Sequence, residues 1–460
     1  MSLIIKNPAT NQVIATLKTE TKATLAQKFQ TLKQGQKVWA AASIVERSRI
    51  LMKFHDLLET HKEALAAILT EEVGKPLQQS RNEINGAKTR IKWLCENALT
   101  YLQTDWMTEQ PDMGEKIVYE PLGVICNISA WNYPYLVGTN VFIPALLAGN
   151  AVLYKPSEFA SLTGKEIHKL LLKAGLPNNV FETAIGTGNV GKFLLDMPFD
   201  GFFFTGSYKT GKYIYQKVAA KMIPCQLELG GKDPLYVADD VEDVKNVAIG
   251  TADGAFYNNG QSCCAVERIY VHEKIYDEYV KAFVEEVKSW KIGAPSEEGV
   301  YIGPLTRAAQ IPLLENQVKE ALAQGATLAY GGKRIDRAGN YFEPTVLTNV
   351  TNDMAVMQEE SFGPIIGIMK VKNDEEATIL MNDTAYGLTA AIYSASQKRA
   401  ENILSNINSG TGYWNCCDRV SPALPWSGRK NSGFGTTLSH VGLRAFTKPK
   451  AYHLRGNWAK

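Results

Sequence analysis

Two adjacent cysteines are the side chains of this sequence best suited to nucleophilic chemistry. Cys263 and Cys264 end the polar run that starts at Asn258, which we expect to be a loop preceding a helical stretch. A thiol in a polar, partly exposed setting ionises more readily and attacks electrophilic carbon. The alternative is an inert core cysteine, which is the commoner case for an intracellular thiol. Adjacent cysteines without nearby histidines do not predict a metal site.

A carboxylate in apolar surroundings is the candidate general base. Glu228 lies between two leucines and before two glycines in Gln226-Leu-Glu-Leu-Gly-Gly-Lys232. Burial raises the pKa of a carboxyl group toward the range that suits a general base. The alternative is a structural carboxylate in a salt bridge, for which Lys232 is the nearest partner in the sequence.

Three further motifs follow apolar runs and suggest a bound nucleotide. Gly186-Thr-Gly188-Asn-Val-Gly191 has the spacing of a turn that binds phosphate at a helix N-terminus, although an ordinary tight turn fits equally well. Ser207 is placed either to cap a helix or to donate to a phosphate. Lys155 and Glu158 follow a strand end, where open α/β sheets bind ligands, and the carboxylate could accept both ribose hydroxyls. Solvated loop charges are the alternative.

The elements that must position these residues alternate between helices and buried strands. Residues 21–74 show a helical pattern, with Ser43 and Glu46 at capping-box spacing and Gly74 at its end. Apolar runs then predict strands at 123–128, 151–154, 180–185, 201–204 and 235–238, separated by amphipathic stretches. This alternation predicts a parallel, doubly wound α/β sheet, and a second series over 241–404 predicts another α/β domain.

Composition excludes several other classes of protein. Among 460 residues, 49 Lys and Arg against 47 Asp and Glu give a net charge of +2, which does not suit a nucleic-acid binder. Residues 121–154 carry no charge, but their prolines and asparagines favour a buried core over a membrane span. No secretory signal is visible, and the seven cysteines are too sparse for a disulfide framework or a zinc site. We therefore expect a cytoplasmic protein without metal.

Six ordered motifs together resemble the aldehyde dehydrogenase superfamily, and the resemblance spans nearly the whole chain, from Asn7 to Phe446. They are Trp131-Asn-Tyr-Pro134, Lys155-Pro-Ser-Glu158, Phe204-Thr-Gly-Ser207, Leu227-Glu-Leu-Gly-Gly231, Gly260-Gln-Ser-Cys263 and Glu359-Glu-Ser-Phe-Gly-Pro364. The resemblance implies an NAD(P)-dependent enzyme of the hydrolytic, non-acylating type. Such an enzyme oxidises an aldehyde to the carboxylic acid.

The resemblance also implies a role for each matching residue. Cys263 would form a thiohemiacetal and then an acyl-thioester, Asn132 would stabilise the oxyanion, and Glu228 would activate the hydrolytic water. The implied cofactor-binding residues are Trp131, Lys155, Glu158, Gly188, Gly206, Ser207, Leu229, Glu360 and Phe362. Because Glu158 would repel a 2′-phosphate, we expect NAD, with NADP as the alternative.

The resemblance further implies a division into three parts and an oligomer. Residues 1–102 and 122–231 would form a Rossmann-like cofactor-binding domain, and residues 232–446 an α/β catalytic domain. Residues 103–121 and 447–460 would form a small β oligomerisation module that makes a homodimer or homotetramer.

The substrate pocket implied by the resemblance is mostly apolar. It would be lined by Tyr133, Val137, Asn140, Ser262, Cys264, Val420, Leu424 and Trp426, which suits an aliphatic or aromatic aldehyde. Arg419 could instead hold the carboxylate of a succinate-semialdehyde-type substrate. A CoA-acylating or non-catalytic structural relative is the remaining alternative. Val141 and Thr437 replace a lysine and a glutamate that many family members link in a proton relay, so we expect water to carry the proton away from Glu228.

Overall fold

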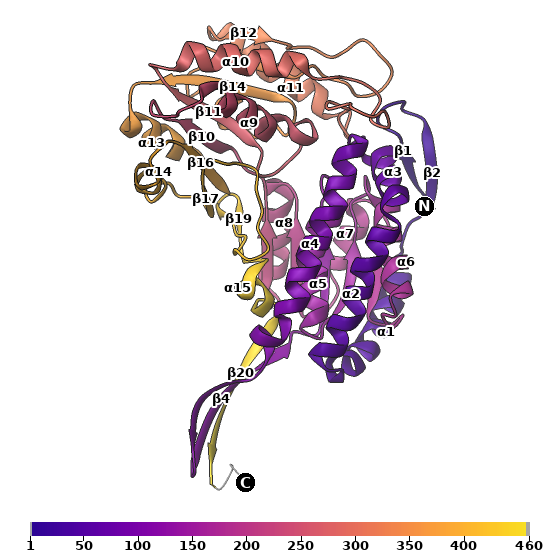
Figure 1. Cartoon of the computed structure of the whole chain (residues 1–460). Helices are drawn as coiled ribbons and strands as arrows, with labels where there is room; N and C mark the ends of the chain where they lie inside the picture. Colours follow the sequence, from indigo (N-terminus) through magenta and orange to yellow (C-terminus); the bar gives the residue numbers. More distant parts are fainter. Residues whose placement is uncertain (1, 457–460) are drawn as a thin grey trace.

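The structure, a computed structural model, describes residues 2–456, so the last four residues of the predicted 447–460 segment lie outside the described part. An elongated body carries an α/β layer at one end and a narrow β arm at the other (Figure 1). The body contains one large sheet, and the α/β layer at its end contains a second. The site described below lies between these two parts.

The first sheet has the order β19-β9-β8-β5-β6-β7. Its five parallel strands are β5 (Val124–Ile128), β6 (Ala151–Lys155), β7 (Phe181–Thr183), β8 (Gly201–Thr205) and β9 (Cys225–Glu228). β19 (Gly433–Phe434) joins antiparallel to β9, so residues from the end of the chain complete this sheet. The predicted buried strands and parallel α/β arrangement are confirmed, although β9 itself was not predicted.

Helices cover both faces of the first sheet. They are α5 (Pro134–Leu147), α6 (Ser161–Lys173), α7 (Gly188–Leu195) and α8 (Tyr208–Ala219), preceded in sequence by α1 (Lys22–Ala41), α2 (Ile44–Thr60), α3 (Lys62–Val73) and α4 (Leu77–Leu102). Ser43 caps α2 by accepting a hydrogen bond from the Glu46 amide at 3.1 Å, as its spacing predicts. Gly74 ends α3 with φ 84°, a conformation that favours glycine. A small hairpin of β1 (Ser2–Lys6) and β2 (Val13–Lys18) lies beside these helices.

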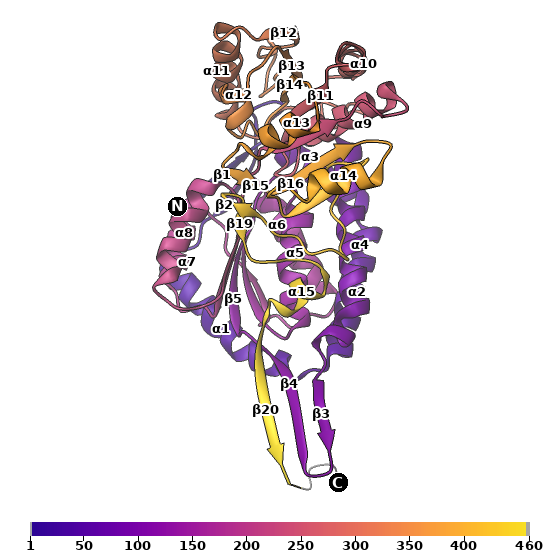
Figure 2. The ribbon, with the colours of Figure 1, turned by 90° about the vertical axis from the view of Figure 1, so that its left-hand side faces the viewer.

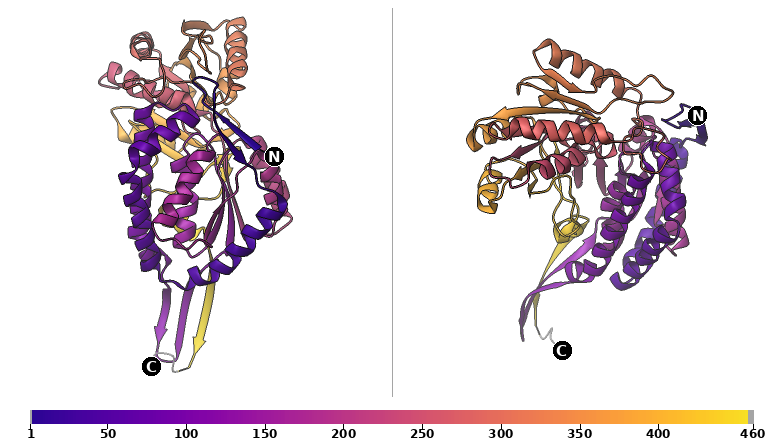
Figure 3. Two further views of the ribbon diagram at one scale, coloured as in Figure 1. Left: turned by 90° about the vertical axis from the view of Figure 1, so that its right-hand side faces the viewer. Right: turned by 45° about the horizontal axis from the view of Figure 1, so that its top comes forward.

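The second sheet has the order β12-β13-β14-β11-β10-β16-β17. The strands are β10 (Asp233–Val237), β11 (Val266–His272), β12 (Thr327–Tyr330), β13 (Thr345–Thr348), β14 (Ile365–Val371), β16 (Thr389–Tyr393) and β17 (Thr411–Trp414). Helices α9 (Val244–Phe256), α10 (Tyr276–Ser289), α11 (Gln310–Ala323), α13 (Asp374–Asn382) and α14 (Gln397–Leu404) accompany it. Figure 3 shows this layer at the end of the body opposite the arm.

The arm is a three-stranded antiparallel sheet that leaves the body (Figure 2). It consists of the hairpin β3 (Asp105–Gln110) and β4 (Met113–Pro121), with β20 (Thr447–Arg455) paired along β4. All three strands lie in the two segments, 103–121 and 447–460, that the sequence predicts to form a small β module. The uncharged segment 121–154 forms β5, α5 and the beginning of β6 in the core. Over residues 2–456, no helix has the length and apolarity needed to cross a membrane.

Candidate active site

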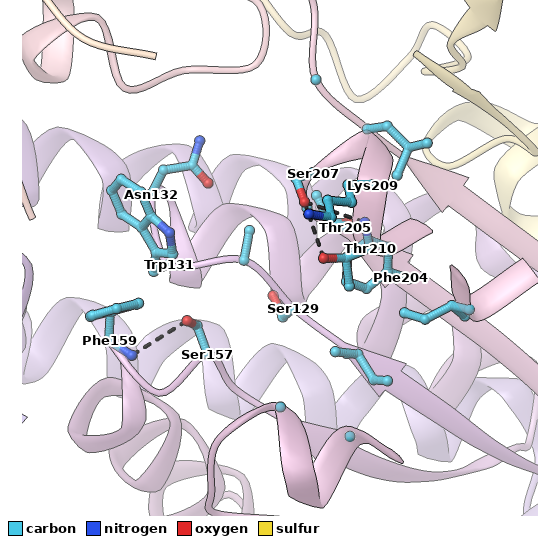
Figure 4. A pocket seen from close by; sticks show the side chains of 18 of the residues that line it. Ser129, Trp131, Asn132, Ser157, Phe159, Phe204, Thr205, Ser207, Lys209 and Thr210 are labelled. Atoms are coloured by element: carbon cyan, nitrogen blue, oxygen red, sulfur yellow. Dashed lines mark hydrogen bonds between the residues drawn. The ribbon is translucent and has the colours of Figure 1, made fainter. Parts of the chain in front are cut away.

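A cleft of about 850 Å³ opens at the carboxyl ends of β5, β6 and β8 and reaches the second sheet. All nine predicted cofactor residues line it, and so do Cys263 and Asn132. Figure 4 shows Trp131 and Asn132 on one side of this cleft and Ser207, at the start of α8, on the other. Motifs that lie far apart in the sequence therefore share one cavity.

An unusual turn presents Cys263 to the cleft. After α9, Asn258, Asn259 and Gly260 have φ values of 54°, 57° and 67°, a left-handed conformation that asparagine and glycine tolerate best. The segment then runs through Cys263 into strand β11. The predicted helical stretch after the cysteines is therefore wrong. β11 is rich in Val, Ile and Tyr and is buried between β10 and β14, which favours a strand.

Asn132 is fixed from two sides. Its side-chain Nδ2 donates to the Gln261 carbonyl at 3.1 Å, two residues before Cys263. Its backbone carbonyl accepts hydrogen bonds from Lys75 Nζ at 2.7 Å and Asn258 Nδ2 at 3.1 Å. Lys75 is buried and paired with Glu83, whose other carboxylate oxygen accepts from the Tyr135 amide at 2.8 Å. The amide group of Asn132 is thus held rigidly near Cys263.

Glu228 ends β9 and has the environment of a general base. Burial raises the pKa of Glu228 to about 7, whereas a hydrogen bond from Thr437 and the charge of Arg90 lower it. Thr437 Oγ1 donates to Glu228 Oε1 at 2.5 Å. Lys232 instead pairs with Glu267 at 2.7 Å, so the alternative of a Glu228–Lys232 salt bridge is wrong.

The cofactor side of the cleft combines a helix N-terminus with aromatic rings. The Ser207 hydroxyl caps α8 by accepting from the Thr210 amide at 3.5 Å. Lys155 Nζ lies 4.0 Å from Glu158 Oε2. The Trp131 ring meets the Phe362 ring edge-on, with the two centroids 5.4 Å apart.

Glu360 lies on the cofactor side of the cleft, next to the glycine pair that follows Glu228. Its Oε1 accepts from the Gly231 amide at 3.1 Å. Burial raises the pKa of Glu360.

On the far side of Cys263 lies a compact apolar cluster. Cys264 and Trp426 pack with Leu388 and Leu438, and Cys263 and Val420 contact this group. Tyr133 and Val137 approach from the start of α5, and Ser262 is buried beside them. Of the predicted pocket residues, Cys264, Val420 and Trp426 therefore share one cluster with Cys263, whereas Leu424 is 59% exposed.

One carboxylate in this region was not foreseen from the sequence. Asp418 Oδ1 accepts hydrogen bonds from Cys264 Sγ at 3.0 Å and from Ser262 Oγ at 3.5 Å. Burial raises the pKa of Asp418 to about 7. The neighbouring Arg419 is exposed, and its backbone carbonyl accepts a hydrogen bond from Tyr413 Oη. The charge of Arg419 opposes the rise in the pKa of Asp418.

Comparison with known proteins decides the family. The sequence profile of the aldehyde dehydrogenase family matches residues 2–452. The chain belongs to the aldehyde dehydrogenase family. Aminoaldehyde dehydrogenase 1 of Pisum sativum, described as peroxisomal, is 35% identical over 456 residues, covering 96% of this chain and 90% of the relative. Aminoaldehyde dehydrogenase 2 of Zea mays is 34% identical over 453 residues with the same coverage.

Solved structures of two similar enzymes share the whole fold. A betaine aldehyde dehydrogenase variant of Staphylococcus aureus, solved with NAD+, is 31% identical with a TM-score of 0.94, covering 99% of this chain and 94% of that one. An NADP-dependent enzyme of E. coli is 29% identical with a TM-score of 0.96, and the coverage is 99% and 95%. The predicted family and α/β fold are confirmed.

Several residues of this aldehyde dehydrogenase escaped the sequence motifs. Arg307, Gln310 and Leu313 border the cleft at or just before the start of α11, and the charge of Arg90 acts on Glu228. They reach the site through long-range packing, and no local spacing marks them. Within residues 2–456, no group of three or more His, Cys, Asp or Glu side chains is arranged to hold a metal ion.

Proposed function

We propose that this aldehyde dehydrogenase oxidises an aldehyde to the carboxylic acid with NAD, using Cys263 as the nucleophile. The observation that carries the proposal is the opening of Cys263 and Asn132 into the same cleft as the nucleotide-binding motifs. Glu228, at the end of β9, supplies the base. A purely structural relative would not need this arrangement, and a CoA-acylating relative would not need the buried base.

The residues divide the chemistry between them. The Cys263 thiolate attacks the aldehyde carbon, and the Asn132 amide with the Cys263 N–H stabilises the oxyanion of the thiohemiacetal, at about 3–4 kcal/mol per donor. A dinucleotide held by the cofactor-side residues of the cleft, among them Ser207 and Glu360, would supply the two-electron oxidation that turns this adduct into the acyl-thioester. Glu228 then takes a proton from water, which attacks the thioester carbon and releases the acid and the Cys263 thiolate.

The cleft fits a dinucleotide. Its volume of about 850 Å³ lies in the upper range of small-molecule sites. A Cβ on Gly188 would meet no atom within 4 Å, so this side of the backbone is open to a ligand. Ser207 and the first amides of α8 would hold the phosphates, and Lys155 with Glu158 the ribose. The Glu158 carboxylate favours NAD over NADP because a 2′-phosphate would be repelled.

For the substrate, we propose an apolar aliphatic or aromatic aldehyde. The cluster around Cys264 and Trp426 supplies apolar surface. A second candidate is an aldehyde with a cationic end, favoured by Asp418 and by the names of the aminoaldehyde relatives. The carboxylated alternative receives less support, because Arg419 is exposed and Asp418 would repel the second carboxylate.

We also propose a division of the chain into three parts, an oligomeric state and a compartment. Residues 1–102 with 122–231 would bind the cofactor, residues 232–446 would hold the nucleophile, and the arm would join subunits into a homodimer or homotetramer. We propose the cytoplasm as the compartment because all seven cysteines are free.

The experiment is a test of NADH or NADPH formation over neutral, cationic and carboxylated aldehydes. We expect activity with NAD that disappears in Cys263→Ala and persists in Cys225→Ala, since burial raises the pKa of Cys225 to about 12 and keeps that thiol neutral. Glu228→Gln should give one NADH per site followed by slow turnover. Absence of any activity in the unaltered protein, or acyl-CoA formation on addition of CoA, would contradict the proposal.

A further inference from the structure

Arg90 is a buried cation that interacts electrostatically with the proposed catalytic residues Glu228 and Cys263. Arg90, on α4, is only 8% exposed, although arginine is rarely buried without an ionic partner. Its Nη1 donates to Asn140 Oδ1 at 2.8 Å, which fixes the guanidinium against α5. Of the ion pairs formed within residues 2–456, none includes Arg90. Its charge is therefore not neutralised by direct contact with a carboxylate.

Four ionisable groups interact electrostatically with Arg90, and two of them, Glu228 and Cys263, belong to the proposed chemistry. Burial lowers the pKa of Arg90, and the charges of Cys264, Glu228, Glu83 and Cys263 act in the opposite direction. A guanidinium keeps its proton in proteins, so Arg90 remains positive throughout turnover.

Two of these groups have another partner. Glu83 is already paired with Lys75, and Cys264 is hydrogen-bonded to Asp418. Of the two carboxylates among these groups, Glu228 is thus the one without a paired cation.

Glu228 has no other cation among its neighbours. Thr437, from the segment before α15 (Ser439–Arg444), gives it a neutral hydroxyl, and Arg90 from α4 is the one positive group that acts on it within the described residues. On α5, Val141 offers no charge one residue after Asn140. Arg90 on α4 is therefore the positive group that favours the carboxylate form of Glu228, which is the form that acts as a base.

We propose that Arg90 is a positioning residue whose guanidinium, fixed by Asn140, stabilises the carboxylate form of Glu228 and the negative charge that returns to Cys263 when the acyl-thioester is hydrolysed. The proposal rests on the proposed function. In this role, Arg90 on α4 acts on the reaction through Glu228 and does not contact the substrate.

The test measures hydrolysis of the acyl-enzyme alone. p-Nitrophenyl acetate transfers its acetyl group to Cys263 with release of p-nitrophenolate, and water then releases acetate, which mass spectrometry of the intact protein follows at each pH. In Arg90→Met, we expect the pH at which hydrolysis reaches half its maximum to rise by roughly one unit, because an opposite charge has been removed. Arg90→Lys should restore most of the shift.

A second variant covers the case in which Arg90→Met does not fold. Asn140→Asp keeps the shape of the side chain and places a carboxylate against Arg90, so its positive charge is neutralised where it stands. We expect a shift in the same direction as in Arg90→Met.

A matched control separates electrostatics from loss of packing. Arg47 is another buried arginine, 6% exposed, whose Nη1 donates only to backbone carbonyls near the end of α1. Arg47→Met should lower stability and leave the pH profile unchanged. An unmoved profile in Asn140→Asp, or an equal shift in Arg47→Met, would overturn the role of Arg90. Failure of the unaltered protein to acylate Cys263 would instead contradict the proposed function.

Discussion

At the scale of single residues, the hydroxyl of Thr437 tunes the proposed base. Burial raises the pKa of Glu228 to about 7, and the Thr437 hydrogen bond opposes this rise because it favours the charged form. Thr437→Val removes the hydroxyl but keeps the backbone pair with Trp426. The pKa of Glu228 should rise, so on acidification hydrolysis of the acyl-enzyme should fall at a higher pH, by up to roughly one unit. Acyl-enzyme decay against pH measures this.

Thr437→Ser is the matched control, since it retains the hydroxyl that donates to Glu228. We expect its pH profile to overlay that of the unaltered protein. A shift toward lower pH in Thr437→Val would mean that the hydrogen bond favours the protonated carboxyl, which contradicts the assignment.

The sequence predicts the residues that carry the chemistry better than it predicts the buried residues that surround them. Cys263, Glu228 and Asn132 lie in short motifs whose residue types suggest their chemistry, and the structure brings Cys263 and Asn132 into one cleft. Arg90 and Asp418 could not be found in this way. An isolated arginine in a helix and an aspartate in a loop are usually solvated, and only the packing of α4 and of the loop after β17 buries them.

At the scale of elements, the two glycines that connect β9 to β10 pack closely against other parts of the site. A Cβ on Gly231 would lie 2.5 Å from the Cys263 carbonyl oxygen, a backbone atom, so that the nucleophile segment would have to move. A Cβ on Gly230 would lie 2.2 Å from Glu360 Oε1, the end of a flexible side chain. Substitution by alanine therefore disturbs a different contact at each position: the Cys263 backbone at Gly231 and the Glu360 side chain at Gly230.

We expect Gly231→Ala to lower kcat by about 100-fold, because displacement of reacting groups by about 1 Å has effects of that size. Gly230→Ala should move the Glu360 carboxylate and raise the KM for NAD more than it lowers kcat. Steady-state kinetics with the best aldehyde of the panel measures both. Equal losses of kcat in the two variants would show that the close packing of Gly231 against Cys263 matters no more for catalysis than the packing of Gly230 against Glu360.

Element prediction failed where tertiary packing decides the outcome. The run after Cys263 was expected to be helical, but hydrogen bonding with β10 and β14 makes it strand β11. The strand β9 was missed because it has only four residues and contains Gln226 and Glu228. The left-handed turn at Asn258-Asn-Gly260 had a local signal in its residue types, since Asn and Gly favour that conformation.

At the scale of the whole molecule, the arm leaves apolar side chains in solvent. Trp106 is 40% and Met107 65% exposed on β3, at the edge of a sheet whose strands project from the body (Figure 2). β17 is likewise an edge strand of the second sheet, with Trp414 38% exposed. The unpaired backbone groups of an edge strand are a template for pairing with another chain, which supports the prediction that the arm pairs with a second copy.

Met107→Glu should therefore break the oligomer, because a carboxylate would be buried at the subunit contact without a partner. Light scattering coupled to size exclusion should show the mass falling from a dimer or tetramer toward the single chain, with unfolding temperature measured alongside. Met222→Glu is the matched control, since Met222 is 93% exposed in the turn after α8, away from the arm. If the single chain is already the species in the unaltered protein, or if both variants keep its mass, β3 is not the subunit contact.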